Sequence, residues 1–286
     1  MKTLTRDKTI TFYHAQCDPE IKMDRHLRWS RGEIKIICAT IAFGMGINKP
    51  DVRWVIHYSM SKTITGYYQE SGRAGRDGDP ADCILYFAYK DKHSHERQIR
   101  EGGGSAMQEH LNNLFCMVSY CMNDVDCRRT ILLDHFDERF IADKCRSKCD
   151  SCELNVKQNR VLEDRDLTKE ALVVDEVVSS LKQSRCQIGQ ADLVLFLRGS
   201  KSQQTNALIE RTQDLPHHGS MKGASITNIE RIIRNMVLNK FLEEVQFHCI
   251  TAALCCGGLM YHCALFFRTM YSLRSFTLVS STTMLA

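Results

Sequence analysis

Residues 127–152 read CRRTILLDHFDERFIADKCRSKCDSC. This stretch holds four cysteines, Cys127, Cys145, Cys149 and Cys152, in the spacing C-x17-C-x3-C-x2-C. The last three are close enough in sequence to converge on one point, and the first can reach back to them from a preceding helix. Four thiolates placed tetrahedrally about 2.3 Å from a metal form a closed structural zinc site, which adds folding free energy and leaves no position open for chemistry. The stretch therefore predicts a subdomain folded around zinc.

Two other readings of these cysteines stay open at this point. Buried free thiols are the first, but the lysines and arginine between the cysteines (Lys144, Arg146 and Lys148) do not suit a core strand. The second exchanges one ligand for Cys116 or Cys121, which lie on the apolar face of the preceding predicted helix. The Cys₄ rule for structural zinc sites favours the quartet.

Composition limits the class of protein. The chain has 286 residues, enough for two modest domains, with 25% charged and 43% hydrophobic residues and a net charge of +4. This mild positive charge permits a polyanionic partner without requiring one. The 14 cysteines are spread over a long chain and no apolar signal segment follows Met1, so a reducing, intracellular location is expected. Cys38 and Cys83 lie in apolar runs and are expected in the core.

Strand and helix patterns alternate over residues 9–88. The expected strands are Thr9–Tyr13, Ile34–Ala39, Val52–His57 and Cys83–Ala88, and the expected helices are Glu20–Ser30 and Thr63–Ser71. This alternation predicts a parallel sheet with helices packed on it. In such folds ligands bind at the carboxyl ends of the strands.

The rest of the chain reads mainly as helices. Residues 90–105 end in GGGS and are expected to form a flexible connection, residues 106–135 are expected to be helical, and residues 153–167 read as a linker. Three further helices, Thr168–Gln183, Gln190–Leu197 and Ser225–Leu242, suit a small winged-helix module. The last of them opens with a cap, Ser225 or Thr227.

The tail has a different composition. Residues 249–286 contain no acidic residue, and residues 249–267 contain no charged residue at all. By length the latter stretch can span a bilayer, but its glycines and the missing basic flank favour a buried hairpin. No membrane association is expected.

Two segments carry chemistry. Residues 42–51, AFGMGINKPD, follow a strand and form a glycine-rich turn. Residues 67–78, YYQESGRAGRDG, place Arg73 and Arg76 on a glycine-flanked turn after a helix carrying Gln69. Two guanidinium groups presented in this way can bind a phosphate chain and stabilise phosphoryl transfer. The alternative is an exposed basic turn paired with Asp77 and Asp79.

These segments resemble a known family. AFGMGINKPDVRWVIHY and YYQESGRAGRDG are similar, in sequence and in separation, to motifs V and VI of RecQ-family DNA helicases. CRR, HFDE and the cysteine pattern resemble the RecQ zinc-binding subdomain, and FLRGSKSQ (196–203) with IERIIRNMVLNKFLEE (229–244) resembles the RecQ winged helix. The resemblance covers roughly residues 9–245.

The resemblance implies an α/β RecA-like lobe with a parallel sheet, followed by a helical zinc-binding subdomain and a winged-helix-like α+β module. The implied boundaries are 1–100 for a partial second RecA-like lobe, 105–155 for the zinc-binding subdomain and 156–248 for the winged helix. Residues 249–286 form an atypical apolar tail.

The resemblance also implies roles for residues of the ATP site. Arg73 and Arg76 would face the γ-phosphate of ATP, with Arg76 as the arginine finger, and Gln69 would couple nucleotide state to lobe closure. The loop that relays hydrolysis to strand movement comprises Gly44, Gly46, Asn48 and Asp51.

Other implied roles concern DNA. Ser61 and Lys62 would touch the tracking strand, while Arg198, Ser200 and Lys201 would meet the phosphates of duplex DNA, a contact that does not read sequence.

The implied function is that of an ATP-dependent 3′ to 5′ DNA helicase, working with ATP, Mg²⁺ and structural Zn²⁺ at single-strand/duplex junctions in nuclear DNA repair and recombination. The departures are a missing G-x-x-x-x-G-K-[ST] loop, a missing acidic D-E-x-H box and a tail that does not match the family's β-wing. We therefore expect a C-terminal piece, a truncated product or an incomplete gene model, with half an ATP site and no hydrolysis of its own. The alternative functions are a non-catalytic zinc and winged-helix DNA-binding module and, on the tail alone, a membrane protein.

Overall fold

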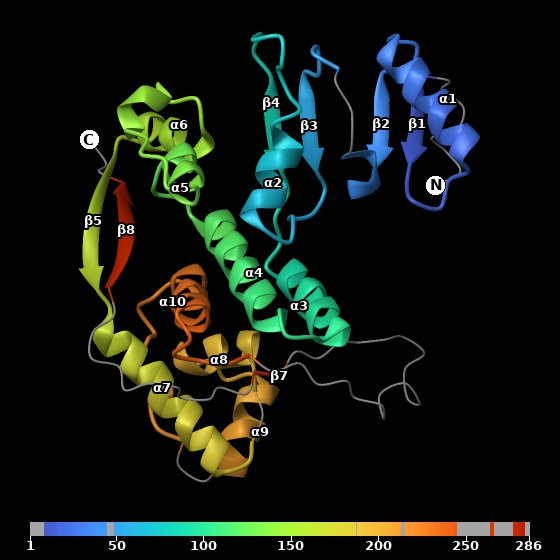
Figure 1. Ribbon diagram of the computed structural model, residues 1–286. Helices are drawn as coiled ribbons and strands as arrows, with labels where there is room; N and C mark the ends of the chain where they lie inside the picture. The colour runs from blue at the N-terminus through green and yellow to red at the C-terminus, as the bar shows by residue number, and fades with distance from the viewer. Residues whose placement is uncertain are drawn as a thin grey trace. The chain divides into compact units, whose positions relative to one another are not determined.

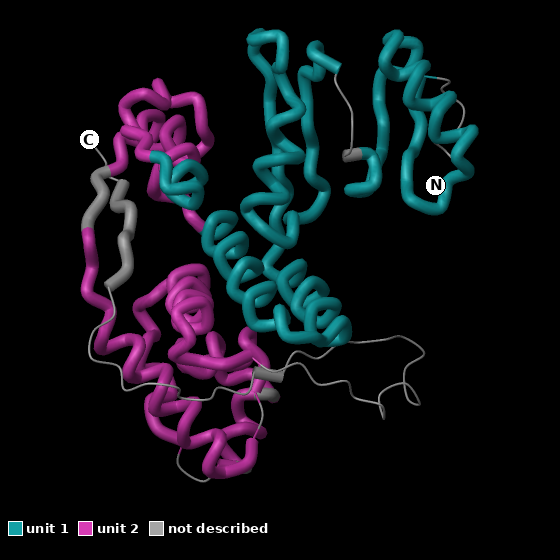
Figure 2. The backbone as a smooth tube through the Cα atoms, in the orientation of Figure 1, with its two compact units in different colours: residues 1–122, 132–138 teal, residues 123–131, 139–286 magenta. Residues whose placement is uncertain are grey.

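In the computed structural model the chain forms two compact units, residues 1–122 with 132–138 and residues 123–131 with 139–286 (Figure 2). The structure describes residues 9–44, 49–186, 188–212, 215–244, 264–265 and 277–283. The element order is shown in Figure 1.

The first unit begins with two β-α-β crossovers. Its strands are β1 (Ile10–Tyr13), β2 (Ile36–Ala39), β3 (Trp54–His57) and β4 (Asp82–Leu85), and its crossover helices are α1 (Pro19–Ser30) and α2 (Ile64–Ser71). β1 pairs with β2 and β3 pairs with β4, both in parallel. The expected strands, helices and α/β class are confirmed.

The four strands form two separate parallel pairs instead of one sheet, because no ladder joins β2 to β3 within the described residues. Side chains on these strands are therefore left uncovered: Ile36 is 53% exposed and Trp54 is 65% exposed. The expectation that Cys38 and Cys83 belong to a core was wrong for the same reason, since both are exposed on β2 and β4.

A small aromatic cluster packs under α1. Trp29 and Ile34 are buried, and Phe43, in the 3-10 helix η2 (Ile41–Gly44), lies edge-on to Trp29 at 5.3 Å between ring centroids. Val52, just before β3, packs against the same cluster. The cluster thus connects the first crossover to the start of the second.

The expected flexible connection after β4 was wrong, because residues 90–102 form helix α3 (Lys90–Gly102). Lys92 and Glu96 are only 1% and 4% exposed, and Lys92 Nζ lies 3.1 Å from Glu96 Oε2. Arg100 also contacts Glu96, at 2.7 Å. Burial raises the pKa of Glu96, but the two cations outweigh it and hold that pKa below its usual value. Helix α4 (Met107–Met122) follows, with its apolar stripe buried.

The second unit opens with the cysteine-rich segment. Its elements are α5 (Arg128–Asp134), where the chain passes between the units, the 3-10 helix η3 (Ala142–Cys145), α6 (Asp150–Lys157) and β5 (Arg160–Asp166). The expected linker over residues 153–167 was therefore wrong. The sequence pattern did not indicate strand β5, because its partner lies far along the chain. That partner is β8 (Thr277–Thr283), which pairs antiparallel with β5.

Four helices build the rest of this unit. They are α7 (Thr168–Gln183), α8 (Gln190–Leu197), α9 (Gln203–Thr212) and α10 (Ile226–Leu238). The bounds predicted for α7 and α8 are confirmed, whereas α9 was not expected. Ser225 is the cap of α10, because its side chain accepts a hydrogen bond from Asn228 N at 3.1 Å. The helices share one core, which includes Val174, Phe196, Ile229 and Met236, each fully buried.

A short strand, β6 (Ile188–Gly189), pairs antiparallel with β7 (Ala264–Leu265) beside these helices. None of the helices in the described part of the chain is long and apolar enough to cross a membrane. The uncharged stretch 249–267 lies outside the described residues, except for 264–265.

Candidate functional site

The two arginines lie on a tight turn after α2. Thr63 caps the helix by accepting a hydrogen bond from Gly66 N at 2.9 Å, and the helix ends at Ser71. Gly75 adopts φ 63°, and a Cβ added there would lie 2.8 Å from the carbonyl oxygen of Asp79. This position therefore requires glycine. Arg73 is half-buried in the turn and Arg76 is exposed.

The turn is fastened to the loop that precedes β3. Gly75 N donates to Val52 O at 2.9 Å, and Asp77 N donates to Pro50 O at 3.3 Å. Arg53 Nη2 donates to Asp77 Oδ1 at 2.6 Å. The arginine turn and the glycine-rich loop are thus neighbours at the amino-terminal ends of β3 and β4. The general expectation of a ligand at the carboxyl ends of the strands does not hold for this turn.

The Arg53–Asp77 pair bears on the basic-turn alternative. The alternative of an exposed basic turn takes Asp77 and Asp79 as the acids that pair with it. Asp77 instead accepts a hydrogen bond from Arg53, which holds the pKa of Asp77 below its usual value. The same pair raises the pKa of Arg53. Among the described residues Arg73 makes no salt bridge. Arg73 is half-buried, and its positive charge contributes to lowering the pKa of Glu70.

The structure describes some of the remaining residues predicted for the ATP site and leaves out others. Gln69 is exposed on α2, and Gly44 is the last residue of η2. Asp51 is exposed, and the hydrogen bond that Lys49 Nζ donates to Asp51 Oδ2 at 3.2 Å lowers the pKa of Asp51. Gly46 and Asn48 lie outside the described residues.

A hydrogen-bond network around Glu70 was not predicted from the sequence. His57 Nε2 lies 2.8 Å from Glu70 Oε2, and Ser61 Oγ donates to the same oxygen at 2.7 Å. Burial raises the pKa of Glu70, but the hydrogen bonds from His57 and Ser61 dominate and hold it below its usual value. The hydroxyl of Ser61, expected on DNA, is thus bonded to Glu70, while Lys62 beside it is exposed. The network ties α2 to the end of β3.

The four predicted cysteines come together in the second unit. Their sulfur atoms all lie within 4.8 Å of one another, and Cys149 Sγ is 3.9 Å from Cys127 Sγ. A tetrahedron with zinc–sulfur bonds of about 2.3 Å has edges of about 3.8 Å, so the spacing fits a Cys₄ zinc site. Cys127 and Cys145 are buried, and Cys149 and Cys152 are half-buried. Four thiols with no oxygen ligand favour zinc over magnesium or calcium.

Local elements position these thiols. Cys127 precedes α5 and Cys149 precedes α6, and the two helix starts are held together by Arg128 Nε and Asp150 Oδ1 at 3.0 Å. Burial raises the pKa of Cys127, but donors from Thr130 and Arg129 at the start of α5 outweigh it and lower the pKa to about 7. Cys116, one of the alternative ligands, is exposed on α4, and the cluster found among the described residues does not include it or Cys121.

The predicted duplex-contacting residues follow α8. Arg198 is half-buried, and its Nε has no hydrogen-bond partner among the described residues. Ser200 O accepts from His218 Nε2 at 3.2 Å, and Lys201 is exposed. Gly199 and Gly219 pack against each other with φ 75° and 74°, and a Cβ on Gly199 would lie 3.0 Å from Gly219 Cα. This close approach fixes the loop that carries the three residues.

Models of three protein families match most of the chain. The helicase conserved C-terminal domain matches residues 1–78, the RecQ zinc-binding domain matches residues 89–153, and the RQC domain matches residues 162–255. The chain belongs to the RecQ helicase family. The RecQ zinc-binding match and the cysteine geometry together identify a structural zinc site, as predicted.

Several RecQ relatives are similar over most of this chain. ATP-dependent DNA helicase Q-like 4B of Arabidopsis thaliana is 38% identical over 82% of this chain and 21% of its own length. ATP-dependent helicase SGS1 of Saccharomyces cerevisiae is 37% identical over 82% of this chain and 16% of its own length. The putative ATP-dependent DNA helicase Q1 of Caenorhabditis briggsae is 42% identical over 82% and 35%. The chain thus spans between 16% and 35% of the length of these relatives.

Among solved structures, the yeast DEAD-box splicing factor Prp28 matches 39% of this chain and 27% of its own, with 17% identity and a TM-score of 0.29.

Proposed function

We propose that this chain supplies the C-terminal part of an ATP-dependent 3′ to 5′ DNA helicase that unwinds single-strand/duplex junctions in nuclear DNA repair and recombination. The observation that carries the proposal is the attachment of the arginine turn to the end of the glycine-rich loop and to the two residues after it. Asp77 N donates to Pro50 O, Gly75 N donates to Val52 O, and Arg53 donates to Asp77. A turn held in this way presents its guanidinium groups from a fixed backbone, as phosphate recognition requires. We keep the boundaries 1–100, 105–155 and 156–248 as the proposed domains.

In this proposal Arg76 is the arginine finger and Arg73 is a second contact to the phosphates. Phosphoryl transfer spreads negative charge over the equatorial oxygens of the γ-phosphate, and a guanidinium at that point stabilises the transition state. Arg76 is exposed on the turn, with its Nε 3.5 Å from the carbonyl oxygen of Gly72, and in this proposal its guanidinium meets a nucleotide held by another lobe. Gln69, Gly44, Gly46, Asn48 and Asp51 are proposed to couple hydrolysis to DNA movement.

We also propose that this chain does not hydrolyse ATP by itself. Its 286 residues contain neither a G-x-x-x-x-G-K-[ST] loop to cradle the phosphates nor an acidic D-E-x-H box to hold Mg²⁺. The two arginines stabilise charge, but they cannot bind Mg²⁺ or orient the attacking water. Mg²⁺–ATP therefore requires groups from a first RecA-like lobe.

Contact with DNA is proposed through the phosphates. Arg198, Ser200 and Lys201 offer a guanidinium, a hydroxyl and an ammonium group beside one loop, and such donors position a duplex without reading its sequence.

The test measures ATP hydrolysis by the purified chain in three mixtures: alone, with single-stranded DNA, and with DNA plus a separately produced first RecA-like lobe of a relative. We expect no turnover in the first two mixtures and DNA-stimulated phosphate release in the third. Robust DNA-stimulated turnover by the chain alone would refute the proposal of half a site. Failure of the third mixture, with both polypeptides folded and in contact, would refute the catalytic role.

The second candidate function is a non-catalytic DNA-binding module. It is favoured by one observation: the second unit has its own zinc cluster and its own helical core, neither of which involves the arginine turn. DNA binding without any turnover in the third mixture would select this function.

A further inference from the structure

The turn that follows helix α5 contacts helix α2. Although α5 begins in the second unit, residues 132–138 belong to the first unit, as α2 does. The rings of Phe136 and Tyr68 lie 4.9 Å apart between their centroids, at an angle of 48°. His135 Nε2 lies 3.3 Å from the hydroxyl of Thr65, which is three residues before Tyr68 on α2. Two neighbouring residues of the turn thus contact one face of α2.

The turn is held in shape by hydrogen bonds to the end of α5. Phe136 N and Glu138 N both donate to Leu133 O, at 2.9 and 3.0 Å, and Asp137 N donates to Asp134 O at 3.0 Å. Asp137 adopts the left-handed region, with φ of 58°. Non-glycine residues seldom adopt this conformation. The place of the Phe136 ring is therefore set by a defined backbone turn.

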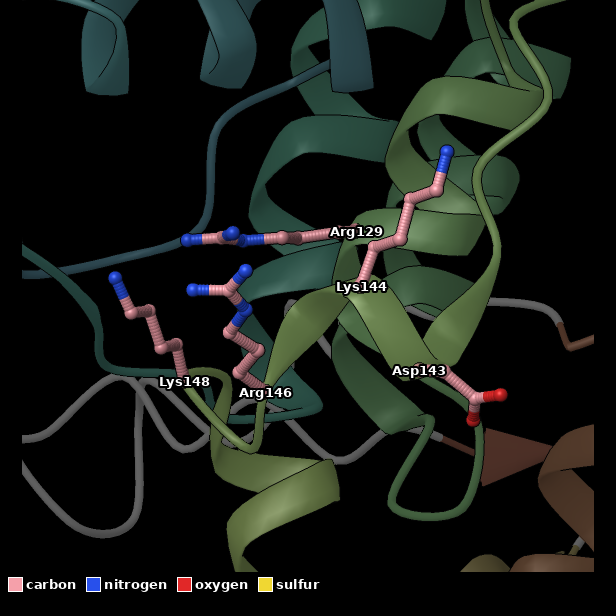
Figure 3. Close-up of a pocket in the computed structure, with 5 residues that line it drawn as sticks. All are labelled: Arg129, Asp143, Lys144, Arg146 and Lys148. Atoms are coloured by element: carbon pink, nitrogen blue, oxygen red, sulfur yellow. The ribbon is translucent and has the colours of Figure 1, made fainter.

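The two ends of α5 serve different parts of the protein. Its start lies in the second unit, where Arg129 lines a basic hollow, and Figure 3 shows its tip beside those of Arg146 and Lys148. Its other end leads into the turn that carries His135 and Phe136. The contact with α2 is thus separate from the hollow, and it is the contact that bears on the arginine turn.

Tyr68 is directly connected to the arginine turn. Gly72 N, at the start of that turn, donates to Tyr68 O at 2.8 Å. A Cβ added to Gly72 would lie 2.9 Å from the same oxygen, so the approach leaves no room for a side chain. Arg76 Nε lies 3.5 Å from Gly72 O. A continuous series of contacts therefore runs from Phe136 through Tyr68 and Gly72 to Arg76.

We propose that Phe136 and His135 are positioning residues for phosphoryl transfer, which restrict the motion of α2 so that Arg76 meets the γ-phosphate. This role rests on the proposed function, which takes Arg76 as the arginine finger. A group of that kind acts by its place, since a misplacement of about 1 Å can cost about a hundredfold in rate. Phe136 touches neither the nucleotide nor Arg76, and it acts through Tyr68.

A competing role for the ring pair is purely structural. In that case the loss of the Phe136 ring destabilises the first unit but leaves the rate of the folded protein unchanged. If the ring acts through Arg76, its loss lowers the rate, and the size of the loss depends on whether Arg76 is present. Comparing the same substitution in both backgrounds separates the two roles.

The first measurement follows hydrogen exchange by mass spectrometry in the zinc-loaded chain alone. For Phe136→Ala we expect the backbone amides of residues 64–78 to exchange about threefold to tenfold faster, because an aromatic pair restrains local opening by roughly that factor. Phe136→Tyr retains a ring and should keep the original exchange. The matched control is Tyr86→Ala, which removes an aromatic side chain of the same unit that is 60% exposed and makes no ring contact within the described chain.

The second measurement is ATP hydrolysis by the chain supplied with a first RecA-like lobe and DNA. Phe136→Ala should lower kcat by about tenfold to a hundredfold and leave KM for ATP within about twofold, because only transition-state contacts are misplaced. Phe136→Tyr and Tyr86→Ala should retain the original kcat. In the Arg76→Ala background, Phe136→Ala should change kcat by less than about twofold, since the group that it positions is already absent.

A second variant covers the case in which Phe136→Ala does not fold. Thr65→Val removes only the contact with His135 from an exposed position, and it should shift exchange and kcat in the same directions by about threefold.

The outcomes are distinct. Unchanged exchange in the folded variant, or an equal rise in Tyr86→Ala, would overturn the positioning role. Faster exchange at an unchanged kcat would leave the ring pair a purely structural role, as would equal losses of kcat with and without Arg76. If the unsubstituted chain with the lobe and DNA showed no turnover, the proposed function would fall and the positioning role with it.

Discussion

At the scale of single residues, Glu70 shows how the first unit holds the helix that leads to the arginine turn. Its carboxylate accepts hydrogen bonds at 2.8 and 2.7 Å from His57 and Ser61, which belong to the end of β3 and the loop after it. Hydrogen bonds to a charged group contribute more than neutral ones, about 1.5 kcal/mol or above. We therefore expect Glu70→Gln to lower the free energy of unfolding of the first unit by about 1.5 kcal/mol near neutral pH.

The effect should depend on pH with a defined sign. The folded pKa of Glu70 lies below its ordinary value of 4.5, so its carboxylate stabilises the fold above pH 4.5. This contribution is lost as the pH falls below 4.5 and through the folded pKa, and the difference between the two proteins should shrink there. Urea unfolding followed by tryptophan fluorescence measures it, because both tryptophans, Trp29 and Trp54, lie in the first unit.

The control for this measurement is Glu138→Gln, which removes an exposed carboxylate from the same unit. It should leave the unfolding free energy nearly unchanged. A pH-independent difference for Glu70→Gln, or one that grew on acidification, would contradict the assigned role of the carboxylate.

Residues of the site were predictable to different degrees. The cysteine quartet could be predicted because metal-ligand spacing is a local property of the chain. The partners of Arg53 and Glu70 could not, because Asp77 and His57 reach them through the packing of β3, α2 and the turn. A carboxylate inside a motif gives no sign in the sequence of which donor it will meet.

At the scale of elements, zinc joins η3 and the starts of α5 and α6. We expect about one equivalent of zinc per chain and its loss in Cys149→Ser, together with lower helical content, because such sites fold with their metal. Metal analysis and circular dichroism check both expectations. The matched control is Cys116→Ser, an exposed cysteine outside the cluster, which should retain zinc. Full zinc occupancy in Cys149→Ser would remove Cys149 from the ligand set.

Elements with an apolar stripe were predicted to within a few residues, as α7, α8 and α10 show. Helix α3 was missed because the sequence KDKHSHERQIREG is almost entirely polar, and its buried Lys92 and Glu96 depend on each other and on Arg100. Strand β5 was missed because its partner, β8, lies more than a hundred residues away in sequence. Pairings of that kind are tertiary and leave no local periodicity.

At the scale of the whole molecule, the two units have separate tasks in the proposed function. The first carries the arginine turn and its supporting contacts, and the second carries the zinc cluster and the helical core. The chain spans at most 35% of the length of the compared relatives.

The central proposal is that Arg76 completes an ATP site whose phosphate-cradling and Mg²⁺-binding groups come from a first RecA-like lobe. The most direct measurement is the rate of DNA-stimulated ATP hydrolysis by the chain supplied with that lobe, compared between the unsubstituted protein, Arg76→Ala and Arg31→Ala, the last removing an exposed arginine far from the turn in sequence. The account predicts a loss of about a thousandfold or more in kcat for Arg76→Ala, in line with other arginine fingers, and no loss for Arg31→Ala. A decrease of less than about tenfold in Arg76→Ala, with zinc content and folding intact, would contradict it.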